Sequence, residues 1–146
     1  MTAAPEVELV DAPALYVVGE LVAAPFERLH VEVPRAWERL AANGVVEGRR
    51  LAEASFTTEA GYVEVVGVLG EQPPETVPAG QVPVVMPAGR YARLVHGGPV
   101  TAIADGFARI YAWAEEHGIR LGARKLDIGY ERAGAHELRI DVVSGD

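Results

Sequence analysis

The sequence predicts an α+β fold: two strand-helix-strand-strand modules, related by a pseudo-twofold axis, contribute to an antiparallel sheet with a ligand cleft between them. Three observations lead to this prediction. The length of 146 residues suits one domain with a single core. Apolar residues follow strand-like alternation in several short runs and helical spacing in two segments. Finally, short motifs of the first half recur in the second half at one constant interval.

The first module covers about residues 6–70. Its predicted elements, in chain order, are a strand over 7–19, a helix over 35–43, and strands over 50–57 and 62–69. Pro13 interrupts the first strand, which we therefore interpret as bent. Trp37 and Leu40 fall on one apolar helical stripe, and Pro34 suits the first turn of that helix because a proline there loses no hydrogen bond.

The second module covers about residues 83–143 and repeats the order. Its predicted elements are a strand over 84–95, a helix after the turn 96–99 that ends at His117-Gly118, and strands over 124–131 and 137–143. Between the modules, residues 71–82 contain three prolines and no apolar period, which is typical of a connection or a lid.

The two halves correspond residue by residue. Three pairs of motifs are each 74 positions apart: Pro13-Ala14 with Pro87-Ala88, Asn43-Gly44 with His117-Gly118, and Phe56 with Tyr130. Matching elements lie between them, so we expect an internal duplication within a single domain over residues 1–146. A junction of two such units is a common place for a ligand pocket.

Composition excludes several classes of function. The 13 basic and 21 acidic residues give a net charge of -8, which disfavours phosphate backbones, so we expect no direct nucleic-acid partner. No cysteine is present, which excludes disulfides and thiolate zinc sites. No apolar run approaches the roughly 20 residues of a membrane span. We expect a soluble, cytoplasmic protein without a membrane partner.

Three motifs of the second half stand out: Val-Val-Met-Pro-Ala-Gly-Arg-Tyr-Ala at 84–92, the His-Gly-Gly turn at 96–98, and Ile-Tyr-Ala-Trp at 110–113. Together they resemble the GyrI-like family of bacterial effector-binding, or multidrug-binding, domains. The opening at 13–19 and the closing strand at 137–142 also resemble the family, so the likeness spans nearly the whole chain. The resemblance implies two fused strand-helix-strand-strand modules around a small-molecule pocket.

Members of this family include multidrug-responsive regulators, gyrase-inhibitory proteins and hydrolases of genotoxic natural products. Regulators carry an additional DNA-binding domain, for which the segment before the first predicted strand is too short. The resemblance therefore implies a stand-alone binding domain that sequesters or senses drugs or toxins.

The family commonly places a glutamate in the penultimate strand, where it meets cationic ligands. Asp127 is the nearest match to that glutamate, with Glu131 as the alternative, because strand alternation puts both on one face, opposite Tyr130. Glu53 lies 74 positions before Asp127 and is a third candidate. A buried carboxylate either recruits a cation or has a raised pKa.

Aromatic rings could supply stacking area and hold cations over their faces. The candidates for ligand binding are Trp113, Tyr91, Trp37, Tyr111, Tyr130 and Tyr16. The four histidines show no metal-like spacing, and no phosphate-binding loop is present, so we expect neither a metal nor a cofactor.

These observations favour reversible binding of amphiphilic or cationic organic compounds over catalysis. One alternative is a hydrolase in which Asp127, Glu131 or Glu53 activates water against a reactive natural product. Another is a module that presses its acidic surface onto a protein partner such as gyrase or a regulator. Turnover of the ligand would distinguish the first, and strong salt dependence would distinguish the second.

Overall fold

The computed structural model describes residues 7–43, 47–59, 61–131 and 135–143. The strands are β1 (Glu8–Ala12), β2 (Leu15–Ala24), β3 (Leu51–Thr58), β4 (Gly61–Gly70), β5 (Val82–Met86), β6 (Gly89–Gly97), β7 (Leu121–Ile128) and β8 (Ala135–Val142). The helices are α1 (Leu29–Asn43) and α2 (Ile103–His117), each preceded by one 3-10 turn. None of these helices is long and apolar enough to cross a membrane.

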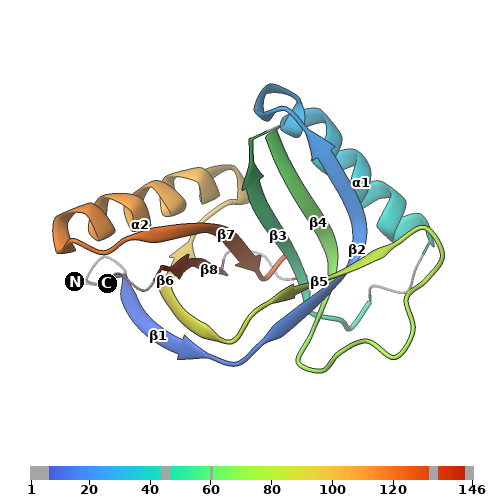
Figure 1. Ribbon diagram of the computed structural model, residues 1–146. Coiled ribbons are helices and arrows are strands. Elements are labelled where there is room, and N and C mark those ends of the chain that lie inside the picture. Colours follow the sequence, from blue (N-terminus) through green and yellow to red (C-terminus); the bar gives the residue numbers. More distant parts are fainter. Residues whose placement is uncertain (1–6, 44–46, 60, 132–134, 144–146) are drawn as a thin grey trace.

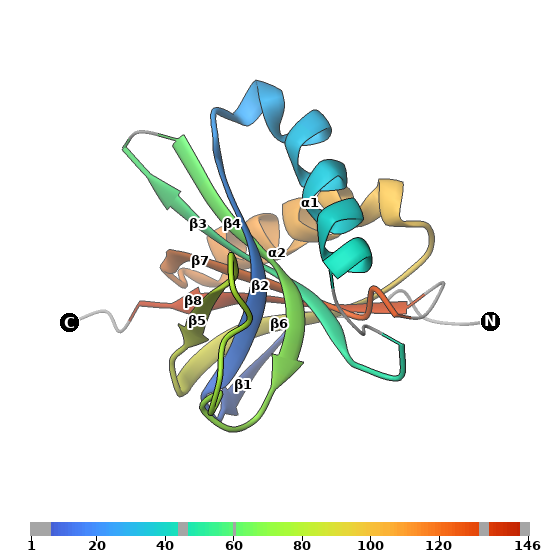
Figure 2. The same ribbon diagram turned by 90° about the vertical axis from the view of Figure 1, so that its right-hand side faces the viewer.

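The strands form one curled antiparallel sheet in the order β1-β6-β8-β7-β3-β4-β2-β5. Figure 1 shows both helices on the same side of this sheet, diverging from each other, and Figure 2 shows the curl of the strands beneath them. Helix α1 packs on β2 and β4, and α2 packs on β6 and β8. The two central strands, β3 and β7, therefore lie between the helices. The predicted α+β fold class is confirmed.

The elements repeat at the interval that the motifs predict. Helix α1 spans 29–43 and α2 spans 103–117, and β1 and β5 begin at 8 and 82, a shift of 74 in each case. The halves also exchange strands, because β1 pairs with β6 and β5 pairs with β2. This repetition supports the proposed internal duplication.

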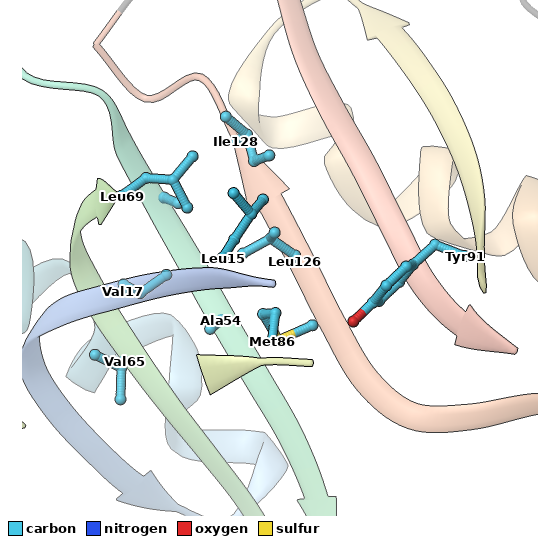
Figure 3. Packing of buried hydrophobic residues seen from close by; sticks show 10 residues of the cluster. Leu15, Val17, Ala54, Val65, Leu69, Met86, Tyr91, Leu126 and Ile128 are labelled. Atoms are coloured by element: carbon cyan, nitrogen blue, oxygen red, sulfur yellow. The ribbon is translucent and has the colours of Figure 1, made fainter. Parts of the chain in front are cut away.

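The largest apolar cluster fills the inside of the curl, on the face away from the helices. It comprises Leu15, Val17, Ala52, Ala54, Val65, Leu69, Met86, Tyr91, Leu126 and Ile128, and Figure 3 shows these side chains converging from strands of both halves. Successive side chains of a strand point to opposite faces. Since Ala52, Ala54, Leu126 and Ile128 point into the curl, the residues between them point toward the helices.

Helix α1 begins six residues earlier than predicted, at Leu29, and Pro34 lies inside it. The prediction of Pro34 in the first turn was wrong because it overlooked an apolar spacing of four residues. Leu29, Val33 and Trp37 pack together against the cluster under α1. Burial of this stripe outweighs the one backbone hydrogen bond that the proline cannot donate.

Candidate functional site

A cavity of about 390 Å³ opens between the two helices, above the central strands β3 and β7. Three carboxyl groups line it: Glu53 on β3, Glu64 on β4 and Asp127 on β7. Glu53 and Asp127 face each other directly in the β3–β7 ladder, so they are a cross-strand pair near the centre of the sheet. Strand alternation turns all three away from the apolar core.

Burial raises the pKa of all three carboxyl groups. The pKa of Glu53 is raised to about 8, chiefly by loss of hydration and also by the nearby charges of Glu64 and Asp127, although hydrogen bonds of Trp37 and Tyr130 lower it. Loss of hydration likewise raises the pKa of Glu64 to about 7, although the positive charge of Lys125 opposes the shift. At neutral pH, therefore, Glu53 is mostly protonated and Glu64 is about half ionised.

Asp127 is held by two hydrogen bonds. The Tyr130 hydroxyl donates to Oδ2 at 2.5 Å, and Nδ1 of the buried His136 lies 2.8 Å from Oδ1. Burial raises the pKa of Asp127, and both hydrogen bonds oppose that rise because they stabilise the carboxylate. The resulting chain of tyrosine, aspartate and histidine is fixed at the floor of the cavity.

A glycine explains how Tyr130 reaches Asp127. Strand alternation predicts Tyr130 on the face opposite Asp127. However, β7 ends at Ile128, and Gly129 has a φ of 124°, a backbone conformation that residues with a side chain rarely adopt. The backbone turns there and brings the phenol ring back over the cavity. The predicted placement of Tyr130 opposite Asp127 is therefore wrong.

The same turn separates Glu131 from Asp127. Glu131 is exposed, and its Oε1 accepts a hydrogen bond from the backbone N–H of Leu51 at 3.0 Å. It does not line the cavity, so the prediction that it shares a face with Asp127 fails for the reason given for Tyr130.

Trp37 of α1 connects the helix to the acidic pair. Its indole N–H donates to Oε2 of Glu53 at 2.5 Å, and its ring centroid lies 4.9 Å from that of Tyr130. The ring of Tyr130 in turn meets His136 edge-on at 4.8 Å. Trp37 thus fixes the orientation of Glu53 from behind the cavity wall.

The outer part of the cavity is aromatic. Tyr62 of β4 and Phe107 and Tyr111 of α2 line it, and the ammonium group of Lys125 lies over all three rings, 5.3 to 5.7 Å from their centroids. Phe26, which is 70% exposed, packs against Tyr62 at 5.5 Å and extends the aromatic surface outward.

Three of the predicted ligand-binding aromatics lie elsewhere. Tyr91 is buried in the core inside the curl, where its hydroxyl donates to the carbonyl of Pro87. Trp113 packs against the apolar cluster under α2 and stacks on His117 at 4.6 Å. Tyr16 lines a separate cavity of about 410 Å³ beneath the connection between β4 and β5.

Several polar and aromatic residues at the central cavity were not predicted as site residues. They are Phe26, Ser55, Tyr62, Glu64, Phe107, Lys125 and, beneath Asp127, His136. Two signals were present in the sequence. Glu64 is the one charged residue in an otherwise apolar strand, and Lys125 is the one lysine of the chain.

The arrangement combines a floor that can donate or accept protons with an aromatic opening. Glu64 Oε2 is buried and has no hydrogen-bond partner among the described residues, so a polar or charged group in the cavity could bind there. In the part of the chain that the structure describes, no three histidine, aspartate or glutamate side chains are grouped so as to hold a metal ion.

Solved structures share this fold at low sequence identity. An integron cassette protein from the mobile metagenome of Vibrio cholerae has a TM-score of 0.73 and 11% identity, over 96% of this chain and 98% of that one. SAV2435, solved with bound tetraphenylphosphonium, has a TM-score of 0.72 and 14% identity, over 95% and 94%. A hydrolase from Listeria innocua has a TM-score of 0.58 and 14% identity, over 97% and 94%.

A comparison with curated protein sequences gave no match. The family model described as the GyrI-like small molecule binding domain matches residues 5–142, which is nearly the whole chain. The eight-stranded sheet with one helix over each half is the architecture that the resemblance implies. The chain therefore belongs to the family of GyrI-like small molecule binding domains.

Proposed function

We propose that the cavity between the helices reversibly binds amphiphilic organic cations. The observation that carries this proposal is the combination, in one cavity, of an aromatic opening with three carboxyl groups, one of which has an unpartnered oxygen among the described residues. Aromatic faces attract weakly hydrated cations, and buried carboxylates favour positive charge that has left water. A ligand with apolar rings and a delocalised charge satisfies both parts.

Because their pKa values are raised, the carboxyl groups of the site can become more negatively charged when a cation binds. Glu53 and Glu64, with pKa values of about 8 and about 7, are largely or partly neutral in the empty cavity, so the protein does not bury several bare carboxylates. A bound cation stabilises their ionised forms and lowers both pKa values. Binding therefore releases protons, and affinity rises with pH.

The ligand-bound structure of SAV2435 supports the choice of tetraphenylphosphonium as the first probe. Titration calorimetry at pH 8 measures its affinity for the wild-type protein and for Glu64→Gln. We expect the variant to bind about tenfold more weakly, because an amide supplies hydrogen bonds but no charge. Equal affinity of the two proteins would contradict the proposed role of the carboxylate.

The matched control is Glu116→Gln, which makes the same chemical change at an exposed position of α2. It should bind as the wild type does, because solvent screens a charge outside the cavity. A comparable loss in both variants would instead indicate long-range attraction by the net charge of -8.

A second candidate function is hydrolysis, which the contrast between Glu53 and Asp127 favours. Glu53 holds a proton at neutral pH, whereas Asp127 accepts hydrogen bonds from Tyr130 and His136 that stabilise its carboxylate. Paired carboxyl groups with distinct environments are suited to acid and base roles.

In this reaction, the oxygen of a water molecule forms a bond to an electrophilic carbon while the bond from that carbon to its leaving atom breaks. Asp127 accepts a proton from the water, and Glu53 donates its proton to the leaving atom. Mass spectrometry of reactive natural products incubated with the protein tests this candidate. Addition of one water per ligand, lost in Asp127→Asn, would support it, and recovery of intact ligand would support binding alone.

A further inference from the structure

Lys125 is the only lysine in a chain with 13 basic residues, and its side chain is in the central cavity. It stands on β7, two residues before Asp127, so strand alternation directs both side chains toward the helices. Every other residue counted as basic is an arginine, and several of these arginines form ion pairs with acidic groups on the surface.

Three aromatic rings surround the end of this side chain. The Nζ atom lies 5.3 Å from the ring centroid of Tyr111, 5.6 Å from that of Phe107 and 5.7 Å from that of Tyr62. Each distance is within the range of a cation–π contact, which extends to about 6 Å. Two elements, α2 and β4, contribute the rings, and the lysine comes from a third.

Charge also favours this position. Glu64 lies close enough for the positive charge of Lys125 to oppose the rise of its pKa. The lysine thus has aromatic faces around its ammonium group and an acidic group nearby, which are the surroundings that we propose for an organic cation. The protein supplies its own cation to its own site.

We propose that Lys125 is a specificity-determining residue that occupies the cation subsite and is displaced by the ligand. This inference rests on the proposed function. A ligand must replace the ammonium group over the three rings. Cations that bind the rings weakly, or that hold their hydration strongly, therefore do not enter. A large delocalised cation competes well, because it loses less hydration than an ammonium group does and covers more aromatic surface.

Displacement requires only side-chain rotation. Lysine has a flexible four-carbon stem, and Tyr111, which is 42% exposed, lies at the opening of the cavity. The released ammonium group regains its hydration in solvent. Lys125 therefore lowers the affinity of the empty site for every cation while leaving the site open to the strongest competitors.

The test compares the affinity of tetraphenylphosphonium for the wild type and for Lys125→Met, which removes the charge but keeps an unbranched side chain. We expect binding to become about tenfold tighter in the variant, because a partly desolvated cation–π contact typically contributes about that factor to affinity. Triphenylphosphine oxide, a neutral compound of similar chemistry, should gain less than about threefold, because only a cation competes for the charge of the site.

Two further variants separate the charge at the subsite from charge elsewhere. Lys125→Arg places a guanidinium group over the rings, which is more weakly hydrated than an ammonium group and stacks on aromatic faces, so it should not bind tetraphenylphosphonium more tightly than the wild type does. Arg124→Met is the matched control: it removes a positive charge from the neighbouring exposed residue, which pairs with Asp141, and should leave the affinity unchanged. Weaker or unchanged binding by Lys125→Met would overturn the inference, as would an equal gain for the neutral compound.

The outcomes separate this inference from the proposed function. Equal binding of tetraphenylphosphonium by the wild type and Lys125→Met would overturn the competition but leave the binding function in place. Absence of binding by both proteins would overturn the inference and the proposed function together, since removal of a competing lysine should expose the site.

A second measurement needs no substitution. Reductive methylation with ¹³C-formaldehyde labels lysine and the N-terminal amine and keeps their positive charge, so Lys125 gives the single lysine signal. Its methyl resonance should lie upfield of its position in urea, because three aromatic rings shield it. Saturating tetraphenylphosphonium should move this methyl resonance back toward its chemical shift in urea. An unshielded signal, or one that the ligand does not move, would overturn the inference.

Discussion

Replacement of Glu53 by glutamine should make the protein more stable at pH 8 and change its stability little at pH 5. The folded state raises the pKa of Glu53 from 4.5 to about 8, chiefly because burial removes its hydration. Between these values the folded protein retains a proton that the unfolded chain releases. The stability contributed by this group is complete below pH 4.5 and is lost as the pH rises toward 8.

The pKa shift sets the size of the effect. At about 1.4 kcal/mol per pH unit, the shift of Glu53 corresponds to a loss of at most about 4 kcal/mol between pH 5 and pH 8. Part of the Glu53 residue remains accessible to solvent and its surroundings relax when it ionises, so we expect about 2 kcal/mol. Glutamine retains an acceptor for the indole N–H of Trp37 but cannot ionise.

Urea denaturation of both proteins across this pH range measures the difference directly. The unfolding free energy of Glu53→Gln should exceed that of the wild type by a margin that grows by about 2 kcal/mol from pH 5 to pH 8, or about 6 °C in Tm. Glu116→Gln, at an exposed site, should show no such growth. Parallel pH profiles for Glu53→Gln and the wild type would refute the reasoning.

Three further predictions concern the floor of the cavity and its ionisation. Trp37→Phe removes the donor to Glu53 and should cost about 1 kcal/mol of unfolding free energy at pH 6 and about 2 kcal/mol at pH 8, where about half of the Glu53 carboxyl groups are charged; equal losses at both pH values would contradict this. Gly129→Ala should cost about 3 kcal/mol in the same assay, because φ is 124° and a Cβ atom would lie 2.7 Å from the carbonyl oxygen of Ala135. Gly118→Ala is its control, with a φ of 66° but no atom within 4 Å of the added Cβ, and should cost about 1 kcal/mol. Finally, tetraphenylphosphonium should bind about tenfold more tightly at pH 8 than at pH 6. Its binding should release protons, which calorimetry in buffers of different ionisation enthalpy detects; uptake of protons would contradict ionisation of the cavity carboxyl groups on binding.

Much of the fold could be predicted because its determinants are local. Period-two alternation predicted the central strands to within three residues at each end, and the interval of 74 between the sequence motifs is also the shift between the two helices. The early start of α1 was not recognised because Pro34 is usually a sign of a first turn, while the stripe of Leu29, Val33 and Trp37 is visible only when the proline is disregarded.

The candidate site was harder to predict because it depends on pairings between strands. Asp127 and Glu53 were found from the family resemblance and the repeat, and the ladder of β3 and β7 brings them together. Tyr130 needed the unusual backbone of Gly129, which alternation alone does not predict. Which tyrosines face the cavity and which face the core depends on the curl of the sheet, which has no local signature in the sequence.

The exchange of strands between the halves has a mechanical consequence for ligand entry. The segment from β1 to β2 runs from one edge strand to the strand beside the opposite edge, and the segment from β5 to β6 does the same from the other edge. Because each half pairs with a strand of the other, the halves cannot separate without breaking the β1–β6 and β2–β5 ladders as well as the central β3–β7 ladder. We therefore expect the spacing between α1 and α2 to change little on binding, and ligands of different shape to be accommodated by rotation of side chains at the opening, above all Lys125.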